Sequence, residues 1–208
     1  IQAHPDLEKR VAKCKLWRSE QTVTGDAYKL HTTPHLLRPC KKFHDVTYIG
    51  IPVVTSSRRK YVPFGFVTNG MIPGNKLYFI ETSSLYHFGV MISQFQNAWM
   101  RVVTGRLGDG FNYSNTIVYN NFVWPEATFK QKKVIEQTAQ DILHVRSNYL
   151  EKSLAELYDP DKMPTDLLAA HKANDAAVEA AYGVNFNGDE EKIVAHLFKL
   201  YAEKAKEK

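Results

Sequence analysis

The sequence predicts an α+β fold, in which an antiparallel β-sheet with helices forms the N-terminal part and an all-α helical domain follows. Residues 46–80 alternate between β-branched or aromatic runs and clusters of Ser, Arg, Asn, Gly and Pro, a pattern typical of antiparallel strands and turns. Residues 125–208 instead repeat apolar residues at spacings of three and four, as amphipathic helices do. We therefore predict two domains, residues 1–124 and 125–208, with Pro125 in the first turn of the second.

The composition is that of a globular protein and argues against a membrane-spanning or disulfide-rich one. The 208 residues are 44% hydrophobic, which is enough for a packed core, and no apolar run approaches the ~20 residues of a membrane helix. The cysteines, Cys14 and Cys40, fit neither a metal spacing nor a disulfide framework, so we interpret both as reduced thiols. We expect a cytoplasmic protein without a membrane partner. Because the chain starts at Ile1 rather than at methionine, and its first residues resemble an internal segment of a larger protein, we also expect a fragment of a longer polypeptide.

Charge is divided unevenly along the chain. Residues 1–124 hold 15 Lys and Arg against 7 Asp and Glu, a net charge of +8, whereas residues 125–208 hold 12 against 15, a net charge of −3. A basic first part indicates a polyanionic partner such as nucleic acid, although a solvated basic face would have the same composition.

The first elements in order are a helix and a short helical segment. Residues 5–20 carry apolar side chains at helical spacing, and Pro5 and Asp6 suit a first turn. A short helical piece is predicted over 26–33, before Pro34 favours an extended chain.

Three strands follow, over residues 46–54, 60–67 and 76–80, and they predict an antiparallel meander. Pro52 and Pro63 favour edge or bulged positions because proline cannot donate to a neighbouring strand.

The turn at residues 56–60 places Arg58, Arg59 and Lys60 in a row after two serines. Cations and hydroxyls together suit contacts to phosphate, and we predict that role for all three cations. A turn that only improves solubility is the alternative.

The turn at residues 73–76 displays Asn75 and Lys76. An amide and an ammonium are among the groups that read base edges, so both are candidates for DNA base readout.

A helix is predicted over residues 85–103, with Thr82 or Ser83 as its cap and with Phe95 and Trp99 facing inward.

The helix leads into a glycine-rich loop, residues 106–112, that presents polar side chains. Asp109 and Asn112 are candidates for base readout, although an Asp in a loop also commonly shapes its own turn. Arg101 and Arg106 frame the loop, and we predict that they contact phosphates; holding Asp109 in place is the alternative.

Residues 111–124 are rich in aromatic, Asn and β-branched residues and predict a strand that is broken near Asn120 and Asn121. The Asn-Asn-Phe sequence lacks the prolines of the Asn-Pro-Pro-aromatic motif of amino-methyltransferases, so no catalytic role is assigned to it.

Four helical segments complete the chain, over residues 125–151, 153–158, 165–182 and 189–208. Asn174 interrupts the apolar face of the third of these.

No catalytic residue, metal site or cofactor site is predicted. His31 and His35 have HxxxH spacing, but no Glu follows His31 and Pro34 disfavours the helix that would align the two rings. The chain also contains no GxGxxG, GxxxxGK[ST] or GxSxG motif.

Four blocks of this sequence resemble one family. They are YIGIPVVTSSRRKYVPFGF, LYHFGVMISQFQNAWMRVVTGRL, YSNTIVYNNFVWP and LAELYDPDKMPTDLLAAHKANDAAVEAAYG. In this order they resemble the C-terminal third of the MmeI-type, or type IIL, restriction–modification enzymes. Those enzymes join an endonuclease domain, an S-adenosylmethionine-dependent adenine methyltransferase domain, a target recognition domain and a C-terminal helical domain in one polypeptide.

The resemblance implies that residues 1–124 recognise double-stranded DNA on behalf of methyltransferase and endonuclease domains upstream. S-adenosylmethionine and a divalent metal, Mg²⁺, are implied for the parent enzyme and none for this fragment. The family reads bases from the turn that holds Asn75 and Lys76 and from positions matching Gly108, Gly110 and Asn112. Two of those positions are glycine here, which implies fewer base contacts and a degenerate position in the DNA site.

Two other classes of function remain as alternatives. One is a protein–protein interaction module that holds a partner subunit through the aromatic strand and the helices. The other, an enzyme complete within these residues, is disfavoured because no catalytic set is present.

Overall fold

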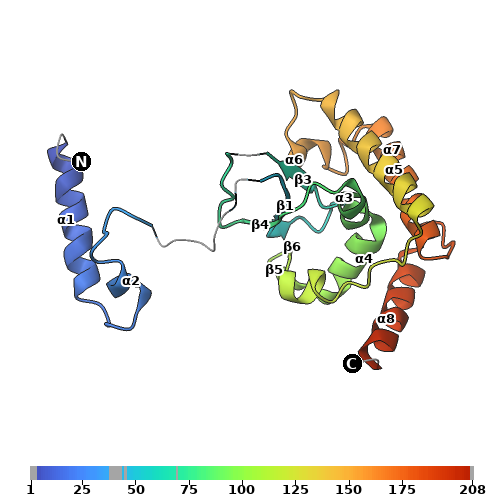
Figure 1. Cartoon of the computed structure of the whole chain (residues 1–208). Helices are drawn as coiled ribbons and strands as arrows, with labels where there is room; N and C mark the ends of the chain where they lie inside the picture. The colour runs from blue at the N-terminus through green and yellow to red at the C-terminus, as the bar shows by residue number, and fades with distance from the viewer. Residues whose placement is uncertain (1–3, 38–43, 45, 69, 207–208) are drawn as a thin grey trace. The chain divides into compact units, whose positions relative to one another are not determined.

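The computed structural model describes residues 4–37, 44, 46–68 and 70–206, and the chain divides into two compact units, Ile1–His44 and Asp45–Lys208 (Figure 1). Cys40 lies outside the described residues. Among the described helices, none is both long and apolar enough to cross a membrane.

The first unit contains α1 (Pro5–Ser19) and α2 (Asp26–Lys29). The prediction for α1 is confirmed, whereas α2 is shorter than predicted. Arg18 of α1 donates to three backbone carbonyls in the segment after α2, those of Leu30, Thr33 and Leu36, at 3.1–3.3 Å. The helix and the segment that follows it are therefore tied together.

The second unit begins with a three-stranded antiparallel sheet. Its strands are β1 (Tyr48–Pro52), β3 (Gly65–Val67) and β4 (Leu77–Ile80), and β1 lies between the other two. The predicted antiparallel pairing is confirmed, but the meander order is wrong because the first strand is central. Pro52 occupies the last position of this central strand, next to a bend at Val53.

A second small sheet follows the bend. It consists of β2 (Val54–Thr55), β6 (Gly110–Asn112) and β5 (Gly105–Leu107), with β6 in the middle. The predicted loop over residues 106–112 is thus a β-hairpin, and this correction matters because both arms of the hairpin have fixed backbones. Gly108 begins its two-residue turn with φ of 59°, a conformation that glycine adopts without strain.

The predicted helix over residues 85–103 is two helices, α3 (Leu85–Ile92) and α4 (Gln94–Val103), which meet at Ser93. Ser93 is extended, and the amide group of Asn97 donates to the Ile92 and Ser93 carbonyls at 3.2 and 2.8 Å. The apolar spacing continues across this break, so the sequence does not reveal it.

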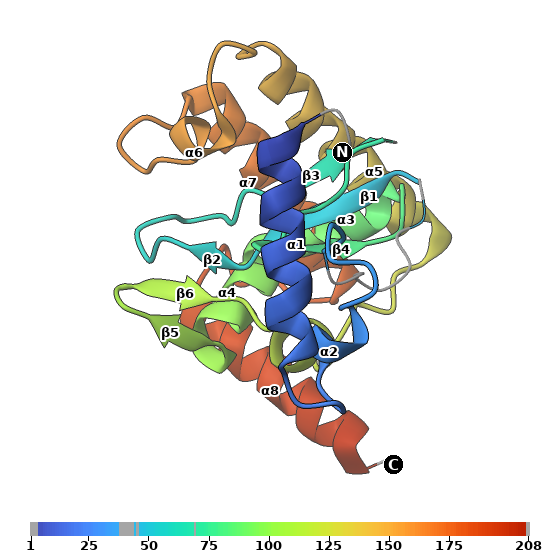
Figure 2. The ribbon, with the colours of Figure 1, turned by 90° about the vertical axis from the view of Figure 1, so that its left-hand side faces the viewer.

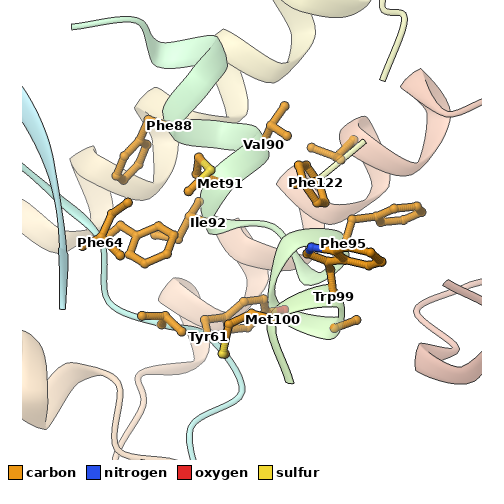
Figure 3. Packing of buried hydrophobic residues seen from close by; sticks show 14 of the residues in the cluster. Tyr61, Phe64, Phe88, Val90, Met91, Ile92, Phe95, Trp99, Met100 and Phe122 are labelled. Carbon is orange, nitrogen blue, oxygen red and sulfur yellow. The ribbon is translucent and has the colours of Figure 1, made fainter. Parts of the chain in front are cut away.

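The cap of α3 is Ser84, whose hydroxyl accepts the His87 N–H at 3.2 Å, rather than Thr82 or Ser83. Both helices lie in the core, where their side chains meet Tyr61, Phe64 and Phe122 (Figure 3). Phe95 and Trp99 are buried as predicted; their exposed fractions are 1% and 3%.

The strand predicted within residues 111–124 extends only to Asn112, and Asn115–Tyr119 form a π-helix, η1. The hydroxyl of Ser114 caps η1, and the indole N–H of Trp99 donates to the Val118 carbonyl at 3.1 Å. A long-range contact therefore helps to hold a helix where the β-branched residues alone predict a strand.

The C-terminal helices are α5 (Phe129–Ser147), α6 (Leu154–Leu157), α7 (Thr165–Ala181) and α8 (Glu190–Lys206). All four predicted segments are helical. The start of α5 lies later than Pro125.

The later start of α5 is explained by a capping box at Thr128. The Thr128 hydroxyl accepts the Gln131 N–H at 3.3 Å, and the Gln131 amide oxygen accepts the Thr128 N–H at 2.8 Å.

The C-terminal helices share one core with the rest of the second unit. A Cβ atom at Gly89 of α3 would lie 2.7 Å from the Ile135 side chain of α5, so the two helices approach closely. Asn174 of α7, which interrupts an apolar face in the sequence, is buried and donates to the Gly89 carbonyl at 2.8 Å. The core crosses the predicted boundary at residue 124, and the division into two domains stays a prediction.

Candidate functional site

Val53, at the bend between the two sheets, joins two of the predicted site segments. Its N–H donates to the Lys76 carbonyl at 3.0 Å, and its carbonyl accepts the Tyr113 N–H at 2.8 Å. The turn that displays Asn75 and Lys76 is thereby fixed next to the end of β6, where Asn112 lies. Asn75, Lys76 and Asn112 are all exposed.

The turn at residues 56–60 is likewise joined to the β5–β6 hairpin. The Ser57 hydroxyl donates to the Asp109 carboxylate at 3.0 Å, and Asp109 stands at the tip of the β5–β6 hairpin. In Figure 2, β2 and the hairpin extend side by side at one edge of the second unit. All three predicted site segments are therefore neighbours around β2.

Asn112 has the most firmly fixed backbone of the predicted base-reading residues. It pairs with Val54 on one side and Gly105 on the other, and its carbonyl accepts the Thr104 hydroxyl at 2.5 Å. Its exposed side chain therefore projects from a fixed point.

The two glycines of the hairpin have different physical causes. Gly108 needs its positive φ, and nothing lies within 4 Å of a Cβ atom built there. Gly110 has an ordinary φ, but its Cβ atom would lie 2.9 Å from the Thr55 carbonyl of β2. Packing against β2 therefore accounts for the absence of a side chain at Gly110.

Two cations of the 56–60 turn, the exposed Arg58 and the half-buried Arg59, have partners in the segment around α6. Arg58 forms an ion pair with Asp161 at 2.5 Å, in which both side chains are more than half exposed. The hydrogen bond and charge of Asp161 raise the pKa of Arg58 above its usual value. Arg59 donates to the Ala155 carbonyl at 3.5 Å.

Lys60 and Arg106 each lie against an aromatic ring. The Lys60 ammonium is 5.5 Å from the centre of the Tyr61 ring, and the Arg106 guanidinium is 4.6 Å from that of Phe111. Both cations remain exposed. Four of the five predicted phosphate contacts, those of Arg58, Arg59, Lys60 and Arg106, therefore have side chains at or near the surface around β2.

Arg101 differs from the other cations because its guanidinium is directed to partners within the protein. It binds both carboxylate oxygens of Glu190 at 3.0 and 3.1 Å and donates to the carbonyls of Arg59 and Lys60. Its side chain is only 16% exposed. Its assignment to phosphate stays a prediction, and its observed contacts hold the end of the 56–60 turn. Asp109, which the sequence placed near it, is instead bound by Ser57.

A buried polar network lies behind this turn. The Tyr61 hydroxyl donates to Asp175 at 2.6 Å, and the other Asp175 oxygen accepts the Gln94 N–H at 2.7 Å. The Tyr61 ring stacks on His171, with centroids 4.2 Å apart. Burial raises the pKa of Asp175 to about 6 and lowers that of His171 well below its usual value.

The network continues through Tyr158, whose hydroxyl lies 2.7 Å from His171 Nε2 and accepts from Arg146 at 2.8 Å. Arg146 also donates to the Phe64 carbonyl at 2.7 Å. Because His171 is fully buried and both carboxylate oxygens of the partly exposed Asp175 are bound within the protein, we assign the network to holding the residues that follow the turn. Sequence reasoning missed it; the signal was the i, i+4 spacing of His171 and Asp175, which places both on one face of α7.

The described residues contain no group of three or more His, Cys, Asp or Glu that could hold a metal ion.

Comparisons with known proteins show the family of this chain. The chain matches the family described as MmeI, target recognition domain, over residues 1–126 and that described as MmeI, C-terminal domain, over residues 127–207. It is 34% identical to DNA methyltransferase A of Bacillus subtilis (strain 168) over 204 residues, which is 98% of this chain and 23% of that protein.

A solved structure also matches: that of the type IIL restriction–modification enzyme MmeI in complex with DNA. The TM-score is 0.89 and the identity 36%, over 99% of this chain and 27% of that one. The chain thus spans about a quarter of the length of the proteins it matches.

Proposed function

This chain belongs to the MmeI family, whose target recognition and C-terminal domains together span it, and we propose that it recognises a specific sequence of double-stranded DNA. The observation that carries the proposal is the clustering of three polar or basic segments around β2. The segments are joined through the backbone of Val53 and through the side-chain hydrogen bond between Ser57 and Asp109, while most of their functional side chains stay exposed.

The two kinds of side chain in this cluster have different proposed roles. The three cations of the 56–60 turn and Arg106 bind phosphates and set the register of the protein on the duplex. Base identity is read by four side chains, those of Asn75, Lys76, Asp109 and Asn112. An amide suits adenine, an ammonium suits guanine, and a carboxylate accepts from the amino group of cytosine.

The chemistry that follows recognition belongs to other parts of the polypeptide. We propose that this chain directs a methyltransferase domain, which uses S-adenosylmethionine to methylate adenine, and an Mg²⁺-dependent endonuclease domain. Both would lie upstream in the same polypeptide, and we propose a cytoplasmic location. The name of the Bacillus subtilis relative supports the methyltransferase part of this proposal, and the subject of the matching structure, a restriction–modification enzyme, supports the endonuclease part.

The salt dependence of binding to duplex DNA tests the proposal. If Arg58, Arg59, Lys60 and Arg106 each neutralise one phosphate, log K against log salt concentration should have a slope of roughly −3 to −4, since each contact contributes about −0.9. Fluorescence anisotropy with a labelled mixed-sequence duplex measures this slope. A chain that binds no duplex at low salt would contradict the proposal and favour a protein-interaction module.

A further inference from the structure

We infer that Glu190 on α8 is a positioning residue for DNA recognition: through Arg101 it holds the end of the 56–60 turn in place without contacting DNA. The inference rests on the proposed function, because it concerns the turn that we assign to phosphate contacts. It also assigns a role in recognition to the C-terminal helices.

The geometry of Arg101 supports this inference. Arg101 lies in the last turn of α4. Its Nη1 atom binds both oxygens of Glu190, at 3.0 and 3.1 Å, and its Nη2 atom donates to the carbonyls of Arg59 and Lys60. One planar guanidinium therefore links the first turn of α8 to the backbone of two successive residues of the 56–60 turn, a geometry that only the rigid fork of arginine provides.

Burial separates Arg101 from the cations that we assign to phosphate. The Arg101 side chain is 16% exposed, against 60% for that of Arg58. If Arg101 turned outward to a phosphate, the Glu190 carboxylate and two backbone carbonyls would lose their donor. That loss would offset much of the gain from one phosphate contact.

Two further acidic residues of the C-terminal part, one between α6 and α7 and one on α7, hold the turn or the residue that follows it. Asp161, after α6, pairs with Arg58 at 2.5 Å, and Asp175 of α7 accepts from Tyr61, directly after the turn, at 2.6 Å. Together with Glu190, which acts through Arg101, three acidic residues of the C-terminal part thus hold the turn or the residue that follows it. Among them, Glu190 is the one that binds a second side chain, Arg101, which in turn donates to backbone carbonyls of the 56–60 turn.

The test compares Glu190→Gln with Glu191→Gln. Both changes remove one negative charge from the first turn of α8, so both alter the helix and the overall charge equally. Arg101 binds the carboxylate of Glu190, and within the described part of the chain no contact of Arg101 with Glu191 is found. Only Glu190→Gln therefore weakens the link between α8 and the 56–60 turn. A third variant, Arg101→Lys, keeps the positive charge and loses the fork.

Two measurements on the 208-residue chain are needed. The first is the affinity for a pool of duplexes of randomised sequence and for a set of single duplexes, each over a range of salt concentrations. The second, made without DNA, is hydrogen exchange at the Arg59 N–H, which donates to the Ser56 carbonyl at 3.3 Å.

We expect Glu190→Gln to bind every duplex about three- to tenfold more weakly than Glu191→Gln, with the same ranking of sequences, as loss of one partly buried charged hydrogen bond suggests. Arg101→Lys should also bind more weakly than wild type. The Arg59 amide should exchange faster in both variants than in Glu191→Gln.

Several results would overturn the inference. Equal DNA affinity of the two glutamine variants would do so, and so would wild-type DNA affinity of Arg101→Lys. A Glu190→Gln variant in which only the melting temperature changes, and not the DNA affinity, would also overturn it. Tighter binding by Glu190→Gln, with a salt slope steeper by about one, would show that Arg101 is itself a phosphate contact. A wild-type chain that binds no duplex would refute the proposed function instead, and the exchange rates at Arg59 would still decide whether Glu190 positions the turn.

Discussion

Replacement of Lys76 by alanine isolates one proposed base contact. The Lys76 carbonyl accepts the Val53 N–H at 3.0 Å, and this backbone bond survives the substitution. The side chain is exposed, so the free energy of unfolding should change by no more than about 0.5 kcal/mol. A change in the free energy of DNA binding larger than this value therefore reflects a lost contact to DNA and not a loss of stability.

The magnitude follows from the kind of contact that is lost. A base contact contributes about 1–3 kcal/mol of discrimination, which corresponds to about a 5- to 140-fold change confined to one base pair of the site. Loss of a phosphate contact would instead weaken all sequences alike and make the salt slope shallower by about one.

The assay is a competition experiment in which unlabelled duplexes, each with one base pair of the preferred site replaced, displace a labelled duplex from Lys76→Ala. Lys199→Ala, which removes an exposed lysine of α8, controls for the loss of charge. Equal weakening on every duplex would refute the assignment of Lys76 to base readout.

Three further predictions concern the turn, the buried network and the hairpin. Changing Arg58 and Arg59 together to Gln should make the salt slope shallower by about 1.8, with the ranking of sequences unchanged; a changed ranking would contradict the phosphate assignment. Burial raises the pKa of Asp175 from 3.8 to about 6. Stability from its protonation is therefore present below pH 4 and lost as pH rises through 6, by at most about 3 kcal/mol, and Asp175→Asn should remove that part of the pH dependence in urea titrations. Gly110→Ala places a Cβ atom 2.9 Å from a β2 carbonyl and should destabilise the chain by about 1–3 kcal/mol. Gly105→Ala, with open space at its Cβ position, is the control, and equal melting of the two would contradict the observed strand pairing.

The sequence predicts the elements more reliably than their connections. Residues 85–103 have continuous apolar spacing, yet the helix breaks at Ser93 because Asn97 and Asp175 satisfy the backbone groups at the break. Asp175 is far away along the chain, and no local pattern reports such a contact.

The hairpin and the π-helix show the same limit. Residues 106–112 have the composition of a loop, and they form a hairpin because β2, which lies far earlier in the sequence, pairs with β6. The β-branched residues of Asn115–Tyr119 indicate a strand, but the caps and the Trp99 contact hold them as a helix.

Part of the candidate site could be predicted from the sequence, and the part that depends on long-range contacts could not. Exposed polar residues in turns can be identified from composition, and Lys76, Asp109 and Asn112 are displayed as predicted. The inward orientation of Arg101 was not predictable because its partners, Glu190 and two backbone carbonyls, are brought together only by the fold.

Selection from a pool of duplexes with a randomised centre tests the central claim most directly. The wild-type chain is bound to the pool, and the retained DNA is sequenced over successive rounds. Sequence-specific recognition predicts that one short motif becomes enriched, and the glycines at positions 108 and 110 predict at least one degenerate position within it. Retained DNA that stays random, or no retained DNA at all, would contradict the claim.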